Sequence, residues 1–504
     1  MTTLGFSVTL LALLLAGCQS RAHEPVVFQW WAGRQAPAFD PDGPPDPLRN
    51  ALEQLLTRSL VREDSLGRPV LDAAESVRIS DDRLRYTFRI RGGLRFVDGS
   101  ACGSEAFRLG LIAGLARTDH GTRLWLLGAV RGAEAVRPRR DLPALAITAP
   151  DPATLVIELS RPDTLLLRKL AVPGASGAWR ARAPAASWSA AVGLGPYRVW
   201  RAEPRALVLA RVLGAGPDTI SVRFGTGAAR ARTALRGGTL DLMWPLPPAL
   251  LDQPLPSGFA PRTRAAGPAR RLSLVMRADV PPTTRLAARR ALAHGIARGE
   301  LTRRFGTGAR EIREWLPGAG PADLPGLDRA EIQRWLERGR LGRSFHVRVA
   351  FDADGAGAAL ARGLQGDWAR SGLSVDLVPL RGGAFSQEAL LGQAQALLVE
   401  EQGLIAGPLG VLATSVMPLR GPGLGAFRTG WRTREFDPWL TPRNSLPAFN
   451  PGFAGRRLEE ETVIVPLVSL DWLWLERTGG RPVGFHPRLG PAPSGAVTPV
   501  ERLR

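Results

Sequence analysis

Side chains that ligate metals or act as nucleophiles are few in this sequence, and their spacing assembles no catalytic motif. The five histidines are far apart: His23, His120, His294, His346 and His486. Two cysteines cannot complete a zinc site, which takes four ligands. The single lysine, Lys169, follows an arginine, so the chain has neither a G-x-x-x-x-G-K phosphate loop nor an S-x-x-K nucleophile. We therefore expect no enzyme, no metal and no cofactor, although a Ser-His-Asp set assembled only in three dimensions stays open.

Aromatic rings and arginines are the side chains best suited to holding a ligand. Trp30 and Trp31 are adjacent. Neighbours on a strand face opposite sides, so on a one-sided sheet one of the two rings is expected to face a cleft. Trp244 stands where a strand runs out into a loop, and Arg34 and Arg277 would add positive charge. The alternative is structural, because most tryptophans pack in cores and most arginines of such a chain are solvated.

The amino terminus resembles an export signal. Residues 4–17 form an apolar run that is short for a membrane span and suits the hydrophobic region of a secretory signal. The run ends in the letters LAGC, which resembles the lipobox of bacterial lipoproteins, with Cys18 as the lipidated residue. No Lys or Arg precedes the run, and a buried N-terminal helix is the alternative. Lipid on Cys18 would leave Cys102 without a disulfide partner and hold the protein at a membrane surface.

Length and charge bound the class of protein. The chain has 504 residues, of which 44% are hydrophobic and 22% are charged. These values suit a globular protein of about three lobes at roughly 150 residues per domain. The formal net charge is +20, and almost all of the positive charge is carried by arginine. A GC-rich genome would produce this arginine bias without any function; alternatively, the positive charge would attract a polyanion. The arginines are scattered, so we expect no nucleic-acid partner.

The first half of the chain reads mainly as strands. Residues 36–47 form a Pro-rich loop, and residues 84–91 alternate apolar and basic side chains as a half-buried strand does. Gly92 and Gly93 predict a hairpin into the next segment. Ser104 is placed to cap a helix over residues 104–116. Further strands are predicted over residues 154–159, 206–212 and 220–224.

The second half alternates helices with strands. A helix is predicted over residues 283–298 from its apolar spacing. Asp328 and Glu331 form a capping pair that opens another helix, which Gly339 closes. A strand over residues 345–351, a helix over 356–371 and a strand over 374–380 make a βαβ unit, which predicts a partly parallel sheet.

These segments together resemble a known family, the extracytoplasmic solute-binding proteins of family 5, which are the peptide- and nickel-binding components of ABC importers. The strongest stretch is residues 70–99, VLDAAESVRISDDRLRYTFRIRGGLRFVDG, which is similar to the family's "LAES", "YTF-x-(I/L)-R" and "G-x-x-F-x-DG" pattern. Shorter similarities keep the family's order along the chain: FDP at 39–41, DPATLVIEL at 151–159, LGPY at 194–197, LRGGTLD at 235–241 and the helix at 281–298.

The resemblance implies a fold and a division of the chain. The fold class is α/β, a two-lobed periplasmic-binding-protein-like (type II) structure with an extra small subdomain. Residues 1–17 would be the lipoprotein signal peptide. Lobe I would span residues 18–260 with the small subdomain inserted at about 46–170, lobe II residues 261–460, and the chain would return to lobe I over 461–504.

The chain departs from the family in the second lobe. Peptide-binding members carry an acidic "W-x-x-DY-x-DP" segment whose aspartate pairs with the peptide's amino terminus, and the matching region here reads LLVEEQGLIAGPLG. Glu400 or Glu401 would replace that acid, since a carboxylate pairs with an ammonium group, or would simply end a strand in solvent. Trp431 and Arg434 lie in a region that often lines the family's pocket, and would clamp an aromatic or anionic ligand.

The sequence therefore predicts a lipid-anchored extracytoplasmic protein, located in the periplasm or at the outer face of the membrane. It is expected to be a monomer that captures a peptide-like or other small solute by lobe closure and delivers it to an ABC permease. One rival is a transporter-orphan sensor or scaffold in the cell envelope. Gln19 suits that rival, because a residue other than aspartate after the lipidated cysteine directs many Gram-negative lipoproteins to the outer membrane. A hydrolase built on this fold and a polyanion binder are the other rivals.

Overall fold

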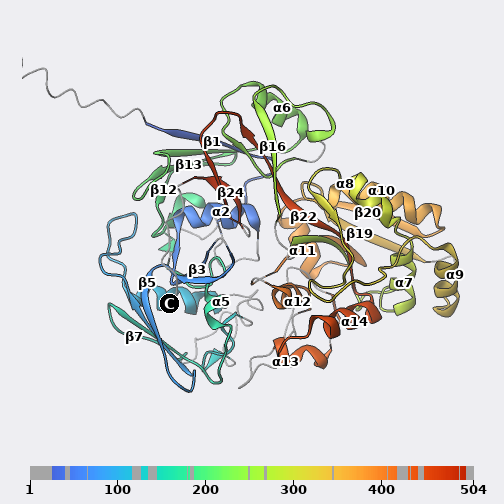
Figure 1. Cartoon of the computed structure of the whole chain (residues 1–504), viewed down its shortest axis with the longest axis horizontal. Coiled ribbons are helices and arrows are strands. Elements are labelled where there is room, and N and C mark those ends of the chain that lie inside the picture. Colours follow the sequence, from blue (N-terminus) through green and yellow to red (C-terminus); the bar gives the residue numbers. More distant parts are fainter. Residues whose placement is uncertain are drawn as a thin grey trace, which may run out of the picture.

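The structure is a computed structural model of the whole chain, shown in Figure 1. It describes residues 25–39, 46–64, 66–115, 126–133, 145–178, 180–181, 187–247, 250–265, 270–342, 345–403, 405, 407–416, 429–431, 433–440, 448–486 and 489–494. The predicted signal peptide and Cys18 lie outside these residues.

A mixed sheet runs through the molecule and contains twelve strands in the described part of the chain. Its order is β12 (Tyr197–Glu203), β13 (Ala206–Arg211), β14 (Thr219–Phe224), β1 (Val27–Ala32), β15 (Leu242–Met243), β22 (Ile464–Arg477), β17 (Arg270–Met276), β21 (Ala396–Gln402), β19 (His346–Asp352) and β20 (Ser374–Leu380). Strands β16 (Phe259–Ala265) and β18 (Ala309–Glu311) also pair with β22. The strands that the sequence predicts at 206–212, 220–224, 345–351 and 374–380 are present within a residue or two.

Strand β22 joins the two halves of this sheet. Its carboxyl-terminal part pairs with β15 and β16, where Leu242 lies opposite Glu476. Its amino-terminal part pairs with β17, where Arg271 lies opposite Ser469. Two chain segments, β16–β17 and β22, therefore pass from one half to the other side by side, and Figure 1 shows helices gathered around each half.

Both faces of the first half of the sheet are covered at β1 and β15. On one face, Phe28 and Trp30 pack with Leu52 of α2 (Pro47–Leu56). On the other face, Trp31 and Met243 pack with residues of α6 (Ala228–Arg236). The expectation that one of the adjacent tryptophans faces a cleft assumed a one-sided sheet, and that premise is wrong at β1, where both faces are covered.

A separate four-stranded sheet packs with α3 (Ser104–Leu115) at the lower left of Figure 1. Its order is β5 (Ala74–Ile79), β6 (Arg85–Ile90), β8 (Thr154–Glu158) and β7 (Ile147–Asp151). The predicted alternation holds in β6, where Phe88 is buried and Arg89 is exposed. The predicted hairpin is wrong, because β6 pairs with β5 and β8, while the residues after it close a small turn bridged between Arg95 and Ala101.

The second half of the large sheet is built as the sequence predicts. Strands β19 and β20 are parallel and are joined by α10 (Gly357–Arg370), which ends before Gly372 at φ 79°. The N-cap of α9 (Arg329–Arg338) is Asp328, whose carboxylate accepts from the Glu331 amide at 3.0 Å. The predicted helix over 283–298 is shorter, since α7 covers Leu286–His294.

The other elements complete the two halves. They are β2 (Arg58–Ser59), β3 (Val61–Glu63), β4 (Pro69–Leu71), α5 (Leu166–Leu170), β9 (Gly177–Ala178), β10 (Arg180–Ala181), η2 (Trp188–Ala190), β11 (Ala191–Val192), η3 (Leu250–Asp252), η4 (Arg298–Glu300), α8 (Leu301–Phe305), α11 (Gly383–Leu391), α12 (Pro408–Val416), η5 (Arg434–Phe436), α13 (Asp437–Leu440), α14 (Pro451–Glu461), β23 (Val483–His486) and β24 (Gly490–Pro493). We keep the predicted division of the chain as a proposal; α2 lies in the range predicted for the small subdomain but packs against the large sheet.

Candidate ligand-binding site

Each half of the large sheet presents the carboxyl ends of parallel strands at one edge. Strand β1 is parallel to β14 and β15 and ends at Ala32, just before Arg34. Strand β19 is parallel to β20 and β21 and ends at Asp352. Ligands of open α/β sheets bind at such edges, because the loops that follow the strands converge there.

Arg34 is held by the first turn of α2. Its Nη2 lies 3.1 Å from Oδ2 of Asp46, and both side chains remain about one-fifth exposed, at 23% and 21%. Asp46 is also the N-cap of α2 and accepts from the Arg49 amide at 2.9 Å. Burial alone would raise the pKa of Asp46, but Arg34, Arg49 and the helix amides outweigh it and lower that pKa. The pair therefore stays ionised at this edge.

Acidic side chains of the second half lie close enough to affect the pKa of this arginine. The pKa of Arg34 is raised first by Asp46, against the effect of burial, and further by Asp352, Glu400 and Asp354. The two halves approach closely here, since a Cβ added to Gly382 would lie 3.8 Å from Oε1 of Gln35. Arg34 therefore sits between carboxylates from both halves.

The pKa of Asp352 is raised from its ordinary value in this setting. Burial raises its pKa. The Asp354 amide donates to Oδ1 of Asp352 at 3.1 Å, and this hydrogen bond and the charge of Arg34 lower the pKa in part. Asp354 and Asp46 add repulsion that raises it again. Arg381 lies 3.7 Å from Asp354. A cationic ligand group would relieve the repulsion among these acids.

Glu400 lies at the junction of the two halves. Arg270 donates from Nε to its Oε1 at 2.7 Å and from Nη1 to the Asp471 carbonyl at 2.6 Å. The same guanidinium lies 4.2 Å from the ring centre of Trp472, on the strand that crosses between the halves. Glu400 therefore lies near the carboxyl end of β21 and is linked through Arg270 to β22, the strand that crosses between the halves.

Glu401 points to the opposite side of β21. Its carboxylate accepts from Arg271 at 2.7 Å and from the Ser273 hydroxyl, and both members of the ion pair are fully buried. Arg271 also donates to the Trp315 carbonyl at 2.7 Å. Glu401 is thus part of the core, and we leave it out of the proposed site.

Trp30 and Trp244 also lie in the core. Nε1 of Trp30 donates to the Trp244 carbonyl at 2.6 Å, and their ring centres are 6.0 Å apart. Trp472 completes the group, 5.5 Å from Trp244. Trp31 packs beside Gly225, whose added Cβ would lie 2.5 Å from the indole ring. None of these rings contributes to the site that we propose.

Two other predicted residues, Arg277 and Trp431, lie toward the far end of β17. Arg277 follows that strand, is fully buried and pairs with Asp279 at 3.6 Å. Thr429, two residues before Trp431, accepts from the Ala278 amide at 2.6 Å. Arg270 and Arg277 stand at opposite ends of a seven-residue strand, so the structure does not bring Arg277 and Trp431 together with Arg34 or Glu400.

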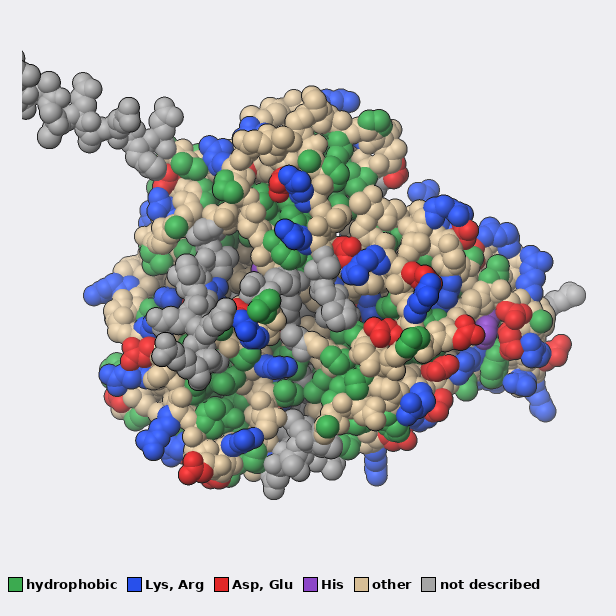
Figure 2. Space-filling view, in the orientation of Figure 1, with side chains coloured by type: hydrophobic (Ala, Val, Ile, Leu, Met, Phe, Trp, Pro, Cys, Tyr) green, Lys and Arg blue, Asp and Glu red, His purple; other side chains and the backbone are tan. Residues whose placement is uncertain are grey.

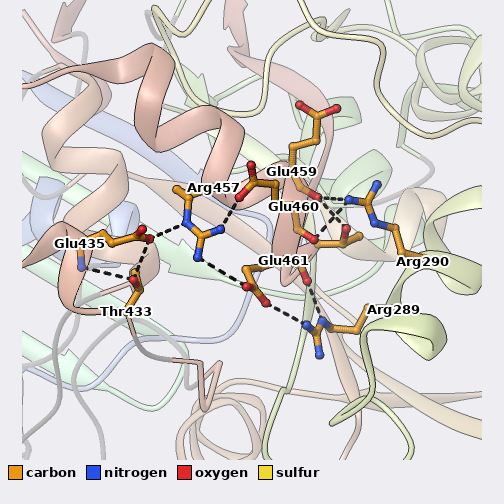
Figure 3. Close-up of polar contacts among 9 residues, drawn as sticks. Arg289, Arg290, Thr433, Glu435, Arg457, Glu459, Glu460 and Glu461 are labelled. Atoms are coloured by element: carbon orange, nitrogen blue, oxygen red, sulfur yellow. Dashed lines mark hydrogen bonds and ion pairs between the residues drawn. The ribbon is translucent and has the colours of Figure 1, made fainter. Parts of the chain in front are cut away.

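The exposed Arg434 stands between Thr433 and Glu435, which Figure 3 shows beside Arg457 of helix α14. Arg457 of α14 contacts Glu435 in this segment, and also Glu461 at 3.6 Å. The Trp431 ring lies 5.7 Å from Phe436. These contacts make the segment part of the packing of the second half.

Figure 3 also shows how α14 ends. Arg289 donates to the Glu461 carbonyl at 2.8 Å, and Arg290 donates to the Glu459 carbonyl at 2.7 Å. Arginines at the last carbonyls of a helix stabilise it, because the helix dipole is negative there. The network thus ties α7 to α14.

Sequence reasoning missed Asp46, Asp352 and Asp354. A signal was present for the last two, because the sequence predicts the strand at 345–351 as the first of a βαβ unit, and DAD follows it directly. Asp46 precedes Pro47 at a helix start, but the stretch reads as a Pro-rich loop. No group of three or more His, Cys, Asp or Glu side chains that could hold a metal ion occurs among the described residues.

Comparison with known proteins identifies the family. Residues 68–400, more than half of the chain, match the family model described as "Bacterial extracellular solute-binding proteins, family 5 Middle". The chain belongs to this family. Its members are binding proteins, so the expectation that the chain is not an enzyme is confirmed.

Curated relatives and solved structures agree with this assignment. The glutathione-binding protein GsiB of Escherichia coli O1:K1 is 28% identical over 160 residues, which is 32% of this chain and 28% of GsiB. The chain thus aligns with under a third of that relative's length. OppA of Haemophilus influenzae, solved with the peptide RPPGFSPFR, has a TM-score of 0.75 at 15% identity. The superposition covers 90% of this chain and 95% of the OppA chain.

A third similar protein is NikA of Staphylococcus aureus, solved with Ni(L-His)2. Its TM-score is 0.76 at 12% identity, over 92% of this chain and 97% of that chain. At such identities the likeness shows the fold alone, which is the two-lobed type II fold that the sequence predicts. We call the halves of the large sheet lobe I (β1, β12–β16) and lobe II (β17–β21), with the small subdomain around β5–β8. No helix in the described ranges is long and apolar enough to cross a membrane.

Proposed function

We propose that the protein captures a small solute between lobe I and lobe II and delivers it to an ABC importer. The observation that carries this proposal is the placement of Arg34 and Asp46, at the edge of lobe I, within electrostatic reach of Asp352, Asp354 and Glu400 of lobe II. Charged groups that meet across two lobes at the ends of parallel strands suit a ligand enclosed between them.

The charges at this edge indicate the chemistry of the solute. Four carboxylates, those of Asp46, Asp352, Asp354 and Glu400, stand beside three arginines, Arg34, Arg270 and Arg381. Arg49 beside Asp46 adds a fourth arginine, so both signs of charge are present in equal number. The carboxylates would pair with an ammonium or guanidinium group of a ligand, and the arginines would hold a carboxylate of the same ligand. A zwitterionic, peptide-like solute has both groups, and GsiB and OppA are named for ligands of this kind.

Closure of the lobes would be the mechanism of capture. The connection between them consists of β22 and the β16–β17 segment, which lie side by side. Bending two adjacent segments changes the angle between lobes without breaking either core. A ligand that contacts both lobes binds the closed form more tightly and so shifts the population toward it.

The location that we propose is the outer face of a bacterial membrane, with lipid on Cys18 and the protein acting as a monomer. The apolar run before Cys18 and the family support this location. Figure 2 shows Lys and Arg side chains spread over the visible face with Asp and Glu among them. That face offers no single basic patch for a polyanion.

The test is ligand binding by matched variants. We would measure the thermal shift of residues 19–504 with a panel of di- to pentapeptides, glutathione and the nickel–histidine complex. The proposal expects a peptide-like compound to raise the midpoint in the wild type and in Asp376→Asn, an exposed control on β20. It expects Arg34→Ala and Asp352→Asn to weaken that binding at least about tenfold, and equal binding by all four proteins would refute it.

A further inference from the structure

Strand β12 forms one edge of the large sheet as described and carries an exposed tryptophan. Trp200 is 68% exposed, and the guanidinium of Arg198 lies 5.3 Å from its ring centre. The pairing of β12 with β13 shifts between Val199 and Arg201, so Trp200 lies at a β-bulge. Bulges are common at sheet edges and re-aim a side chain, and here the large indole ring of Trp200 stands in solvent.

The face of the sheet that bears Trp200 lies outside the buried clusters of the described residues. Along β13, Leu207 and Leu209 are buried in the core of lobe I, while Val208 between them points to the other face. Arg201 lies opposite Val208, and Arg198 lies opposite Ala210. The outward residues of β13 belong to none of the buried clusters of the described chain. We call this surface the outer face of β12–β14.

The outer face and its turns are basic. Between residues 197 and 224, five exposed arginines occur against two carboxylates: Arg198, Arg201, Arg205, Arg211 and Arg223 against Glu203 and Asp218. Both carboxylates are paired, Glu203 with Arg201 and Asp218 with Arg211. Val212 and Leu213, 46% and 43% exposed, add apolar surface at the turn after β13. The surface thus combines positive charge with apolar side chains.

The chain enters lobe I beside this turn. The Val26 amide donates to Asp218 at 2.8 Å, and Val27 pairs with Thr219. Figure 1 shows the start of β1 on the same side as β12 and β13. Pro25 is the seventh residue after Cys18, and a span of seven extended residues reaches at most about 25 Å. A lipid on Cys18 therefore keeps this end of lobe I within about 25 Å of the bilayer.

We infer that the outer face of β12–β14 rests on an anionic membrane surface, with Trp200 at the level of the lipid headgroups. Tryptophan favours this interface because its ring is apolar and its N–H is polar, and arginine pairs with lipid phosphates. The inference rests on the lipid anchor in the proposed function. It assigns lobe I as the half that is fixed to the membrane and leaves lobe II free to move when the lobes close.

The experiment uses residues 19–504, which lack the anchor, so that the face alone is measured. The fraction of protein bound to vesicles is measured by sedimentation in low salt. One set of vesicles is pure phosphatidylcholine, and the other contains 30 mol% phosphatidylglycerol in phosphatidylcholine. We expect binding only to the anionic vesicles, and a fall of at least about threefold for Trp200→Ser and for the double variant Arg198→Glu/Arg201→Glu.

Matched controls come from lobe II. Leu327 is 46% exposed, and Arg303 is 72% exposed and paired with Glu300, as Arg201 is with Glu203. Leu327→Ser and Arg303→Glu should bind as the wild type does. Equal losses in patch and control variants, or no binding of the wild type to anionic vesicles, would overturn the inference. Ligand-induced thermal shifts of the patch variants should be unchanged, which separates this inference from the proposed function.

Discussion

Nη2 of Arg34 lies 3.1 Å from Oδ2 of Asp46, and this ion pair joins the loop after β1 to the start of α2. The pair fixes a guanidinium at the edge where the two lobes approach. Because Asp352, Asp354 and Glu400 of lobe II also act on Arg34, the pair links the two lobes electrostatically. Its strength therefore bears on both the stability of lobe I and the capture of a ligand.

Removing the Asp46 side chain should destabilise the protein by more than an N-cap alone. Asp46→Ala removes the cap of α2 and the partner of Arg34, whereas Asp328→Ala removes only the cap of α9. Loss of a cap costs about 1 kcal/mol. We expect Asp46→Ala to cost clearly more than Asp328→Ala in urea unfolding, and equal costs would show that the Arg34 pair adds nothing.

Neutralising Asp352 should stabilise the empty protein near neutral pH. Its pKa is raised in the folded protein, so between the ordinary value of 3.8 and the raised value the folded form holds more protons than the unfolded form. Stability therefore falls as the pH rises through that window and stays lowered above it. We expect Asp352→Asn to raise the thermal midpoint by about 1–3 °C at pH 7, with no gain at pH 3.5; a lower midpoint at pH 7 would show that attraction to Arg34 dominates.

The adjacent glutamates on β21 should respond very differently to the same substitution. Glu401→Gln leaves the fully buried Arg271 without its charge partner, and breaking such a pair costs about 3–5 kcal/mol. Glu400 is partly exposed, and its pair with Arg270 is open to water. Glu400→Gln should cost less than about 1 kcal/mol but weaken ligand binding. Chemical denaturation of both variants decides this, and similar costs would contradict the assignment.

The lipid anchor predicts a change of location when Cys18 is replaced. Cys18→Ser should abolish labelling by a radioactive fatty acid and move the protein from the detergent phase to the aqueous phase in Triton X-114 partition. Cys102→Ser is the control, because Cys102 is buried in the small subdomain and should not affect lipidation. Labelling that persists in Cys18→Ser would rule out the proposed anchor.

Local patterns in the sequence predicted much of the fold. The strand at 345–351, the helix at 356–371 and the strand at 374–380 were found because their periodicity is set by burial against one sheet, and the Asp328 cap depends on neighbours within three residues. The short hairpin at Gly92–Gly93 was predicted wrongly, since β6 takes partners distant in the chain.

The site was harder to predict, because it is defined by contacts between distant segments. Glu400 and Glu401 are identical in type and adjacent, yet one faces the other lobe and one pairs with Arg271 inside the core. Trp244 appeared to stand on a loop but packs between Trp30 and Trp472, which lie far away in sequence. Which of the many arginines meets an acid across the lobes depends on the register of strands, which no local pattern encodes.

Capture of a solute between the lobes is the central claim, and native mass spectrometry tests it most directly. Residues 19–504, purified from cells grown in rich medium and then mixed with short peptides, would be compared before and after denaturation. The account predicts a discrete extra mass that denaturation removes and that Arg34→Ala and Asp352→Asn reduce. A protein that stays at its own mass in every sample, or an extra mass unchanged in both variants, would contradict it.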